Sequence, residues 1–361
     1  MYTAGRQKRP AGILCRGFEL KGVVMVRNMT GDQARIRDEF VQRSIGPFDS
    51  IRPLEGDAST REYFRVHQGN STFIVCYDNA LKGNTAETYP FLLVQKLLHR
   101  HKIPVPEILF TDSEVGLLIE NDCGDLLLEQ YNTAASHEDR MAHYAGLLDI
   151  LVRMQSIPSD GSLPFTLSFD VEKLMFEFNF FITHALEGYF GCTGVEVKQE
   201  LHDEFLRISM ELYRPEYFVF THRDFHSRNV LVHQGRVVII DFQDARLGLP
   251  QYDLVSILRD SYYSLPRVDM DLLKQRYYLR SKEAGVHSMN PDEFDYYFDL
   301  MAFQRNIKAL GTFAYQVRHF GREKFSKYII PTLAYLHDYC ACRPILKRSW
   351  ELLSAAVGEL R

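Results

Sequence analysis

The sequence predicts an α+β protein with two lobes, a small β-rich lobe followed by a large and mainly helical lobe. Runs of β-branched and aromatic residues, separated by turn residues, recur up to residue 121. Beyond that point, apolar residues recur at helical spacing in one long segment after another. A chain of 361 residues is also long for a single core and suits two lobes.

The elements expected in the first lobe follow in order along the chain. Residues 31–46 have the pattern of a short amphipathic helix. Residues 51–78 predict a strand, a loop of small residues and two further strands joined by a Gln-Gly-Asn turn at 68–70. Residues 90–103 are helix-periodic, and the prolines that follow end the helix. A last strand at 115–121 ends where an Asp-Cys-Gly sequence breaks the apolar run.

The second lobe is expected to be helical around one β segment. Residues 137–157, 171–191 and 198–213 each have helical periodicity. A β segment at 217–241 interrupts them, and further helices are expected from there to the C-terminal end. This order places a β-rich lobe before a helical one.

The join between the lobes is expected near Glu120 to Gly124. It divides the chain into a first lobe at 31–122 and a second lobe at 123–361. Residues 1–30 are expected to be a poorly ordered extension, or the result of a start codon placed too early, since two further methionines lie within them.

Composition excludes several classes of protein. Basic and acidic residues nearly cancel, with a formal net charge of −5, so the chain lacks the concentrated positive charge of a general nucleic-acid binder. No apolar run reaches the roughly 18 residues that a membrane span needs. The six cysteines are scattered and complete no zinc site, as is typical of reduced thiols in the cytoplasm. We therefore expect a cytoplasmic protein that binds neither nucleic acid nor membrane, and the sequence indicates no oligomeric state.

Two neighbouring motifs carry residues suited to phosphoryl transfer. In "HRDFHSRN", Asp224 lies five residues before Asn229, and Asp241 follows twelve residues later in "IIDFQD". A hairpin with its turn at Gln234-Gly235 would bring Asn229 and Asp241 together, and two oxygen ligands suit a Mg²⁺ ion bound to nucleotide phosphates. Asp224 is then free to accept the proton of an attacking hydroxyl, as in the H-R-D-x-x-x-x-N motif of kinases.

The histidines of the first motif are less specific. Asp and Asn are common in turns because they form local hydrogen bonds, so a His-x-Asp pattern alone means little. His222 is either part of the catalytic machinery or a brace for the loop backbone. His226 is expected to be solvated or bracing rather than catalytic.

These motifs, together with three longer segments, resemble the aminoglycoside phosphotransferase and choline kinase family of small-molecule kinases. The longer segments are "GDASTREYFRV", "IIDFQDARLGLPQYDLVSILRDS" and "QRNIKALGTFAYQVR". Within that family the chain is most similar to the kinases of cell-wall amino sugars, which phosphorylate N-acetylmuramate and N-acetylglucosamine at carbon 1. The resemblance implies a protein-kinase-like two-lobed fold, ATP as co-substrate, Mg²⁺, and a sugar substrate in cell-wall recycling.

The resemblance also implies a nucleotide site between the lobes, with two departures from the usual pattern. There is no G-x-G-x-x-G loop, so backbone N–H groups of "GDAST" would hold the phosphates. The third strand has no lysine for the α- and β-phosphates, and Arg65, or Arg61 near it, is the candidate substitute. Glu120 and Cys123 would belong to the hinge that contacts adenine. The loop residues expected to contact the nucleotide are Gly56, Ala58, Ser59 and Thr60.

The substrate side is less well defined by the sequence. Arg259, Gln304 and Arg305 are candidates for sugar contacts, and Asp253 is expected to brace the catalytic loop. Kinases of choline, aminoglycosides or other sugars remain alternatives, and the missing lysine leaves open a silent nucleotide-binding protein. A protein kinase is disfavoured, because Phe-Gln follows Asp241 where protein kinases have Phe-Gly, and no A-P-E segment follows.

Overall fold

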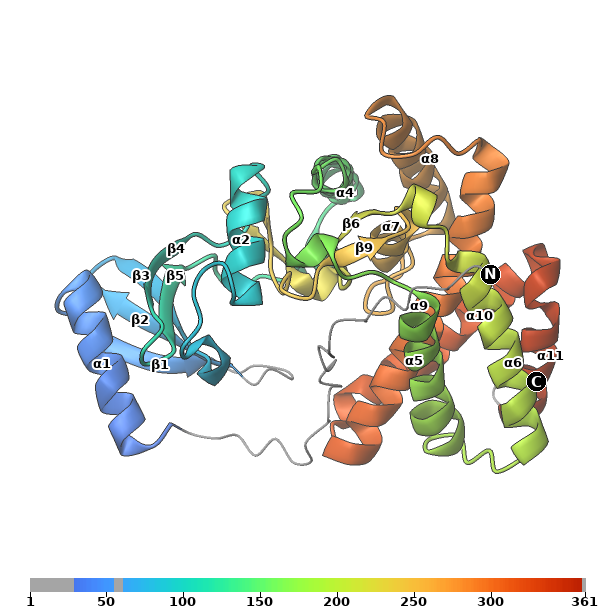
Figure 1. Ribbon diagram of the computed structural model, residues 1–361, viewed down its shortest axis with the longest axis horizontal. Coiled ribbons are helices and arrows are strands. Elements are labelled where there is room, and N and C mark those ends of the chain that lie inside the picture. The colour runs from blue at the N-terminus through green and yellow to red at the C-terminus, as the bar shows by residue number, and fades with distance from the viewer. Residues whose placement is uncertain (1–28, 55–60, 359–361) are drawn as a thin grey trace, which may run out of the picture.

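The molecule has two lobes, as the sequence predicts (Figure 1). The computed structural model describes residues 29–54 and 61–358. The expected extension lies almost wholly outside these residues. So do four predicted nucleotide contacts, which are Gly56, Ala58, Ser59 and Thr60.

The first lobe is built on an antiparallel five-stranded sheet with the order β1-β2-β3-β5-β4. The predicted strands and the turn after Gln68 are confirmed. β4 was not predicted, because this edge strand is short and mostly half-exposed and therefore has little apolar alternation. The strands are β1 (Ser50–Leu54), β2 (Glu62–Gln68), β3 (Ser71–Tyr77), β4 (Ile108–Asp112) and β5 (Leu117–Asn121).

Two helices cover the two faces of this sheet. α1 (Gly31–Ile45) lies on the side away from the second lobe, and α2 (Pro90–Arg100) lies between the sheet and that lobe (Figure 1). α1 buries Phe40 in a small core with apolar residues of β2, β3 and β5. On α2, the ring of Phe91 stacks on Phe242, with centroids 5.1 Å apart. α2 therefore connects the sheet to the segment that follows Asp241.

The second lobe consists mainly of helices. The predicted helices at 137–157, 171–191 and 198–213 are confirmed, although the second of them ends in a π-helical turn, Ile182–Glu187. The long helix α9 is buried through its middle and packs against α5, α7 and α10 (Figure 1). The helices are α3 (Leu128–Ala134), α4 (His137–Gln155), α5 (Val171–Phe181), α6 (Val195–Leu212), α7 (Gln251–Leu258), α8 (Arg267–Glu283), α9 (Pro291–Phe320), α10 (Ile329–Cys342) and α11 (Lys347–Ala356). The connection from β5 to α3 contains the division expected between 122 and 123.

The second lobe also contains two short antiparallel strand pairs, which lie next to the two motifs singled out in the sequence. β7 (Val230–His233) and β8 (Arg236–Ile239) form the predicted hairpin. Its turn residues Gln234 and Gly235 have φ angles of 51° and 73°, as a tight two-residue hairpin turn requires. β6 (Val219–Thr221) pairs with β9 (Arg246–Gly248), a strand that was not predicted. This pairing places the strand before "HRDFHSRN" beside the strand after "IIDFQD".

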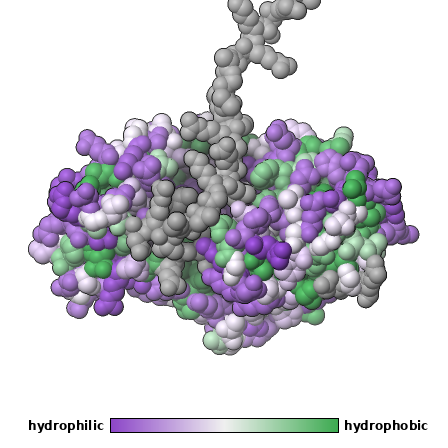
Figure 2. Space-filling model, turned by 90° about the horizontal axis from the view of Figure 1, so that it is seen from below, coloured by the Kyte–Doolittle hydropathy of each residue, from purple (hydrophilic) through white to green (hydrophobic). Residues whose placement is uncertain are grey.

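The face of the molecule in Figure 2 is mixed in character. In Figure 2, hydrophilic and apolar side chains are interspersed over the face seen from below. Within the described part of the chain, no helix combines the length and the apolar character that crossing a bilayer requires.

The helices α5 and α9 pack so closely at Gly311 that adding one methyl group there should destabilise the protein. A Cβ at Gly311 would lie 3.0 Å from Cα and 3.1 Å from N of Phe181, and the backbone of a packed helix cannot easily move away. Gly311→Ala should therefore lower the free energy of unfolding by about 1–3 kcal/mol, measured by chemical denaturation.

The matched control is Gly146→Ala in α4, where a Cβ meets no atom within 4 Å. This substitution should stabilise the protein by about 0.5–1 kcal/mol, because alanine has less backbone freedom to lose in a helix. Equal effects at the two positions would contradict the packing argument.

Candidate active site

The catalytic loop after β6 is held at its start by a buried carboxylate. Asp253 of α7 accepts hydrogen bonds from the backbone N–H groups of His222, at 2.6 Å, and Arg223, at 3.0 Å. Arg223 has a φ angle of 84°, a left-handed conformation that costs about 1–3 kcal/mol in a non-glycine residue. Burial raises the pKa of Asp253 to about 7, and the two backbone hydrogen bonds oppose that rise. The prediction that Asp253 braces this loop is confirmed.

The end of the same loop is held by a second carboxylate. Asp260, just after α7, accepts from the backbone N–H groups of Ser227 and Tyr262, both at 2.8 Å. Burial raises the pKa of Asp260 to about 6. Asp260 was not predicted as a functional residue. Its spacing from Asp253 across one short helix is a signal that could have identified it.

His222 is a structural brace. The residue is fully buried, and burial lowers the pKa of its imidazole. The Nε2 atom lies 3.0 Å from the carbonyl oxygen of Ile240, and Nδ1 accepts from the backbone N–H of Asp224 at 3.3 Å. A neutral imidazole with its proton on Nε2 satisfies both contacts. The ring therefore connects the catalytic loop to the residue before Asp241.

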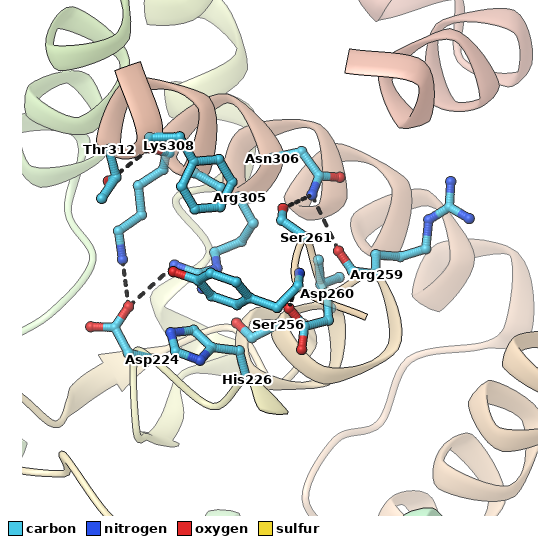
Figure 3. Close-up of a pocket in the computed structure, with 14 residues that line it drawn as sticks. Asp224, His226, Ser256, Arg259, Asp260, Ser261, Arg305, Asn306, Lys308 and Thr312 are labelled. Carbon is cyan, nitrogen blue, oxygen red and sulfur yellow. Dashed lines mark hydrogen bonds and ion pairs between the residues drawn. The ribbon is translucent and has the colours of Figure 1, made fainter. Parts of the chain in front are cut away.

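Asp224 lies among positive charges. Its Oδ1 atom is 2.7 Å from the ammonium of Lys308 and 3.7 Å from a guanidinium nitrogen of Arg305 (Figure 3). The Nε atom of Arg223 is 3.9 Å from Oδ2. Burial by itself would raise the pKa of Asp224, but these three cations hold it well below its ordinary value. The carboxyl group is therefore ionised at neutral pH.

The two expected metal ligands lie side by side. The Nδ2 atom of Asn229 donates to the backbone oxygen of Asp224 at 2.9 Å and faces Oδ2 of Asp241 at 3.3 Å. This arrangement leaves Oδ1 of Asn229 available as a ligand. Asp241 has a φ angle of 64°, and its Oδ1 accepts from Gln243 at 2.8 Å. The described residues contain no cluster of three or more His, Cys, Asp or Glu side chains that could hold a metal ion by themselves.

A pocket opens beside Asp224. His226 lines it, and burial lowers the pKa of this imidazole to about 3, so the ring is neutral. Lys308, Arg305 and Arg259 also line it. Lys308 lies in the segment "QRNIKALGTFAYQVR", but no role was predicted for it from the sequence. Figure 3 shows that Arg305 and Lys308 point toward Asp224, whereas the guanidinium of Arg259 points away.

Two expected substrate contacts are engaged elsewhere. Gln304 is fully buried and donates to Glu177 at 2.9 Å, so the expectation that it contacts the sugar is wrong. Its position on α9 turns it toward α5 instead of the pocket. Arg259 lines the pocket, but its guanidinium bonds to Asp338 and to the hydroxyl of Tyr339. Its sugar contact stays a prediction.

Arg65 is engaged in ion pairs, and the two expected hinge contacts, Cys123 and Glu120, are buried. Arg65 bonds to the carboxylates of Asp122, at 2.6 and 3.0 Å, and Asp125, at 2.6 and 2.7 Å. It therefore ties β2 to the hinge, and its contact with phosphate stays a prediction. Cys123 is buried, and burial raises the pKa of its thiol to about 11. Glu120 is buried, and its Oε2 has no hydrogen-bond partner among the described residues.

Arg61 lies closer to the catalytic machinery than Arg65 does. Its guanidinium bonds to Asp78 at 3.0 Å and to Oε1 of Gln243 at 3.2 Å, and it lies 4.8 Å over the ring of Phe91. Gln243 in turn donates to Asp241. Arg61 is thus linked through the side chain of Gln243 to Asp241, one of the expected metal ligands.

Comparison with known proteins decides the family. Residues 50–291 match the profile of the phosphotransferase enzyme family. The chain belongs to the phosphotransferase enzyme family. It is 30% identical to an N-acetylmuramate/N-acetylglucosamine kinase of Neisseria meningitidis over 84% of this chain and 89% of the relative. It is 29% identical to a protein of the same name from Pseudomonas aeruginosa over 88% of this chain and 92% of the relative.

An aminoglycoside phosphotransferase and a choline kinase of known structure share the fold. An ADP-bound aminoglycoside phosphotransferase is 15% identical, with a TM-score of 0.57 over 86% of this chain and 99% of its own. A choline kinase from Streptococcus pneumoniae is 14% identical, with a TM-score of 0.58 over 85% of this chain and all of its own. The protein-kinase-like fold predicted from the sequence is confirmed, and the chain is a phosphotransferase.

The buried carboxyl of Glu120 in this phosphotransferase makes stability depend on pH. Burial is the main cause that raises its pKa to about 8, Arg61 opposes the rise, and Asp122 adds to it. A folded-state pKa above the unfolded value gives stability that is present below the unfolded pKa and is lost as pH rises through about 8. Glu120→Gln should therefore raise the melting temperature at pH 9 and have a smaller effect at pH 5. A difference between variant and wild type that stays constant with pH would contradict this account.

Proposed function

We propose that the chain transfers the γ-phosphoryl group of ATP to the anomeric hydroxyl of N-acetylmuramate or N-acetylglucosamine, in the cytoplasmic recycling of cell-wall sugars. Relatives that this chain matches over most of their length are named N-acetylmuramate/N-acetylglucosamine kinases, which supports the sugar and the reaction type. The observation that carries the proposal is the position of Asp224. Asp224 is ionised and lines the pocket, and its backbone oxygen accepts from Asn229, which faces Asp241, so an acceptor and a metal-bound phosphate can meet there.

Asp224 acts mainly by orienting the acceptor. The three cations around it make it a weak base, so it does not remove the hydroxyl proton ahead of bond formation. As the bond between the sugar oxygen and the γ-phosphorus forms and the bond to the β–γ bridging oxygen breaks, the proton passes to Asp224. An anomeric hydroxyl is more acidic than an ordinary alcohol and needs little assistance. A loose transition state, in which positioning matters most, suits this arrangement.

The residues present suit a Mg²⁺ ion held jointly with the nucleotide. Oδ1 of Asn229 and the carboxylate of Asp241 are oxygen ligands of the kind that Mg²⁺ takes. Two protein ligands are few, which fits an ion that completes its coordination with substrate phosphates and water. When bound, the ion would neutralise charge on the transferring group.

The pocket disfavours a cationic acceptor such as choline. The ammonium of Lys308 and the guanidinium of Arg305 both point into it (Figure 3). A quaternary ammonium group is usually recognised by aromatic rings, without a neighbouring positive charge. A neutral or acidic sugar fits these donors better.

Arg61 is the candidate substitute for the missing strand lysine. Arg61→Met should raise the KM for ATP about tenfold or more, because a hydrogen bond to a charged group contributes about 1.5–3 kcal/mol. Arg65→Met is the matched comparison. Since Arg65 is bonded to the hinge carboxylates, its loss should lower the melting temperature and change the KM for ATP less. A larger rise in KM from Arg65→Met than from Arg61→Met would reverse the assignment.

The site of transfer can be tested with a blocked sugar. The enzyme is offered N-acetylglucosamine and its 1-O-methyl glycoside with ATP, and ADP formation and phosphorus NMR are followed. Only the free sugar should be phosphorylated, because the glycoside has no anomeric hydroxyl. Equal phosphorylation of both would refute transfer to carbon 1 and leave the kinase assignment intact. No turnover of either sugar, or of N-acetylmuramate, would refute the amino-sugar assignment.

A further inference from the structure

Lys308 is the cation in closest contact with Asp224. Its Nζ atom lies 2.7 Å from Oδ1 of the carboxylate, and its side chain is 15% exposed. Arg305, one turn earlier on α9, contacts the same oxygen only at 3.7 Å and donates to the hydroxyl of Tyr252. The second oxygen, Oδ2, has a longer contact of 3.9 Å with Arg223. One oxygen of Asp224 is thus held by a short ion pair, and the other makes only this longer contact.

The charges around Lys308 come from three elements. Arg305 lies on its own helix α9, Arg223 and Asp224 come from the catalytic loop, and Glu177 comes from α5. Two cations and two carboxylates therefore surround one ammonium. Burial, with Arg305 next in size, lowers the pKa of Lys308 to about 8, while Asp224 and Glu177 oppose the change. The ammonium is charged at neutral pH, and it loses its proton within the range over which enzymes are assayed.

We propose that Lys308 is a positioning residue for Asp224: its charged ammonium fixes Oδ1, so that Oδ2 receives the acceptor hydroxyl. This inference rests on the proposed role of Asp224 and not on the identity of the sugar. A carboxylate that is held at one oxygen by a short ion pair keeps its rotamer while the substrate binds. Misplacement of a catalytic group by about 1 Å can cost roughly 100-fold in rate.

The proposal predicts how activity depends on pH. Below pH 8 the ammonium is charged and Asp224 is held, and as pH rises through about 8 the ion pair is lost. The turnover number should therefore fall on the alkaline side. Six neighbouring groups do not produce this fall, because the pKa values of Arg223, Arg305 and Tyr252 are raised and those of His222, His226 and Glu177 are lowered. Asp253, with a pKa of about 7, gains charge as pH rises and then accepts the loop N–H groups more strongly, which is opposite to a fall. The pKa of Lys173, beside Glu177, is also lowered, so this lysine needs its own control.

Four variants separate the positioning role from a structural one. Lys308→Met should lower kcat by about 10- to 100-fold, with a smaller change in either KM, and should abolish the alkaline fall. Lys308→Arg keeps a cation that does not titrate in this range, so it should restore part of kcat and move the fall to higher pH. Lys173→Met should retain the fall. So should Lys274→Met, the matched control: this lysine is 19% exposed and bonds to Asp295 at 2.9 Å, away from the pocket.

Glu120 needs a control of its own, because its pKa is also about 8. If Glu120→Gln removes the alkaline fall and Lys308→Met keeps it, the proposal is overturned. An unchanged kcat in Lys308→Met also overturns it.

A second measurement keeps the proposal testable if a variant folds poorly. The effect of Lys308→Met should largely disappear in the Asp224→Asn background, because both substitutions then act through one group. Independent effects of the two substitutions would contradict the proposal. The assays use whichever acceptor the enzyme phosphorylates, so failure of the amino-sugar assignment is seen separately.

The titration can also be observed without substrate. In protein labelled with ¹³C at lysine Cε, the resonance that is missing in Lys308→Arg should titrate near pH 8. A titration above pH 10 would overturn the proposed cause of the alkaline fall.

Discussion

The active site depends on the two carboxylates that hold the backbone of the catalytic loop. Asp253 accepts from two consecutive N–H groups at the start of the loop, and Asp260 accepts from Ser227 near its end. Asp253 lies in α7 and Asp260 lies two residues after its end, and every residue of that helix is buried. The backbone of the loop is therefore anchored to the buried core of the second lobe. This support offsets the left-handed conformation of Arg223, which places Asp224 at the mouth of the pocket.

The fold and the central residues were predictable because they depend on short-range patterns. Asp224 and Asn229 precede one short hairpin and Asp241 follows it, so the hairpin brings Asn229 and Asp241 together. The Gln-Gly turn determines that hairpin. Helix periodicity likewise identified the long helices. The edge strand β4 escaped prediction because its apolar residues are few and partly exposed, so no periodic signal marks it.

The sequence did not reveal contacts between residues that lie far apart along the chain. Lys308 reaches Asp224 across 84 residues, and Arg65 reaches the hinge carboxylates across 57 and 60 residues. An arginine beside a phosphate loop and an arginine bonded to a hinge look alike in a sequence. Gln304 shares a helix with Arg305, but helix rotation turns it toward Glu177 and away from the pocket. Only the packing of α9 against α5 and α7 decides which of these neighbours lines the pocket.

The charges around Asp224 show which kind of catalysis this site favours. A strong general base needs a pKa near the working pH, and the cations of Lys308, Arg305 and Arg223 move Asp224 away from that range. The same cations fix the carboxylate and add positive charge where a phosphoryl group would pass. Phosphoryl transfer through a loose transition state gains more from placement and charge neutralisation than from early proton removal. The surroundings of Asp224 therefore favour an acceptor whose hydroxyl loses its proton easily, a property that an anomeric hydroxyl has and an ordinary alcohol lacks.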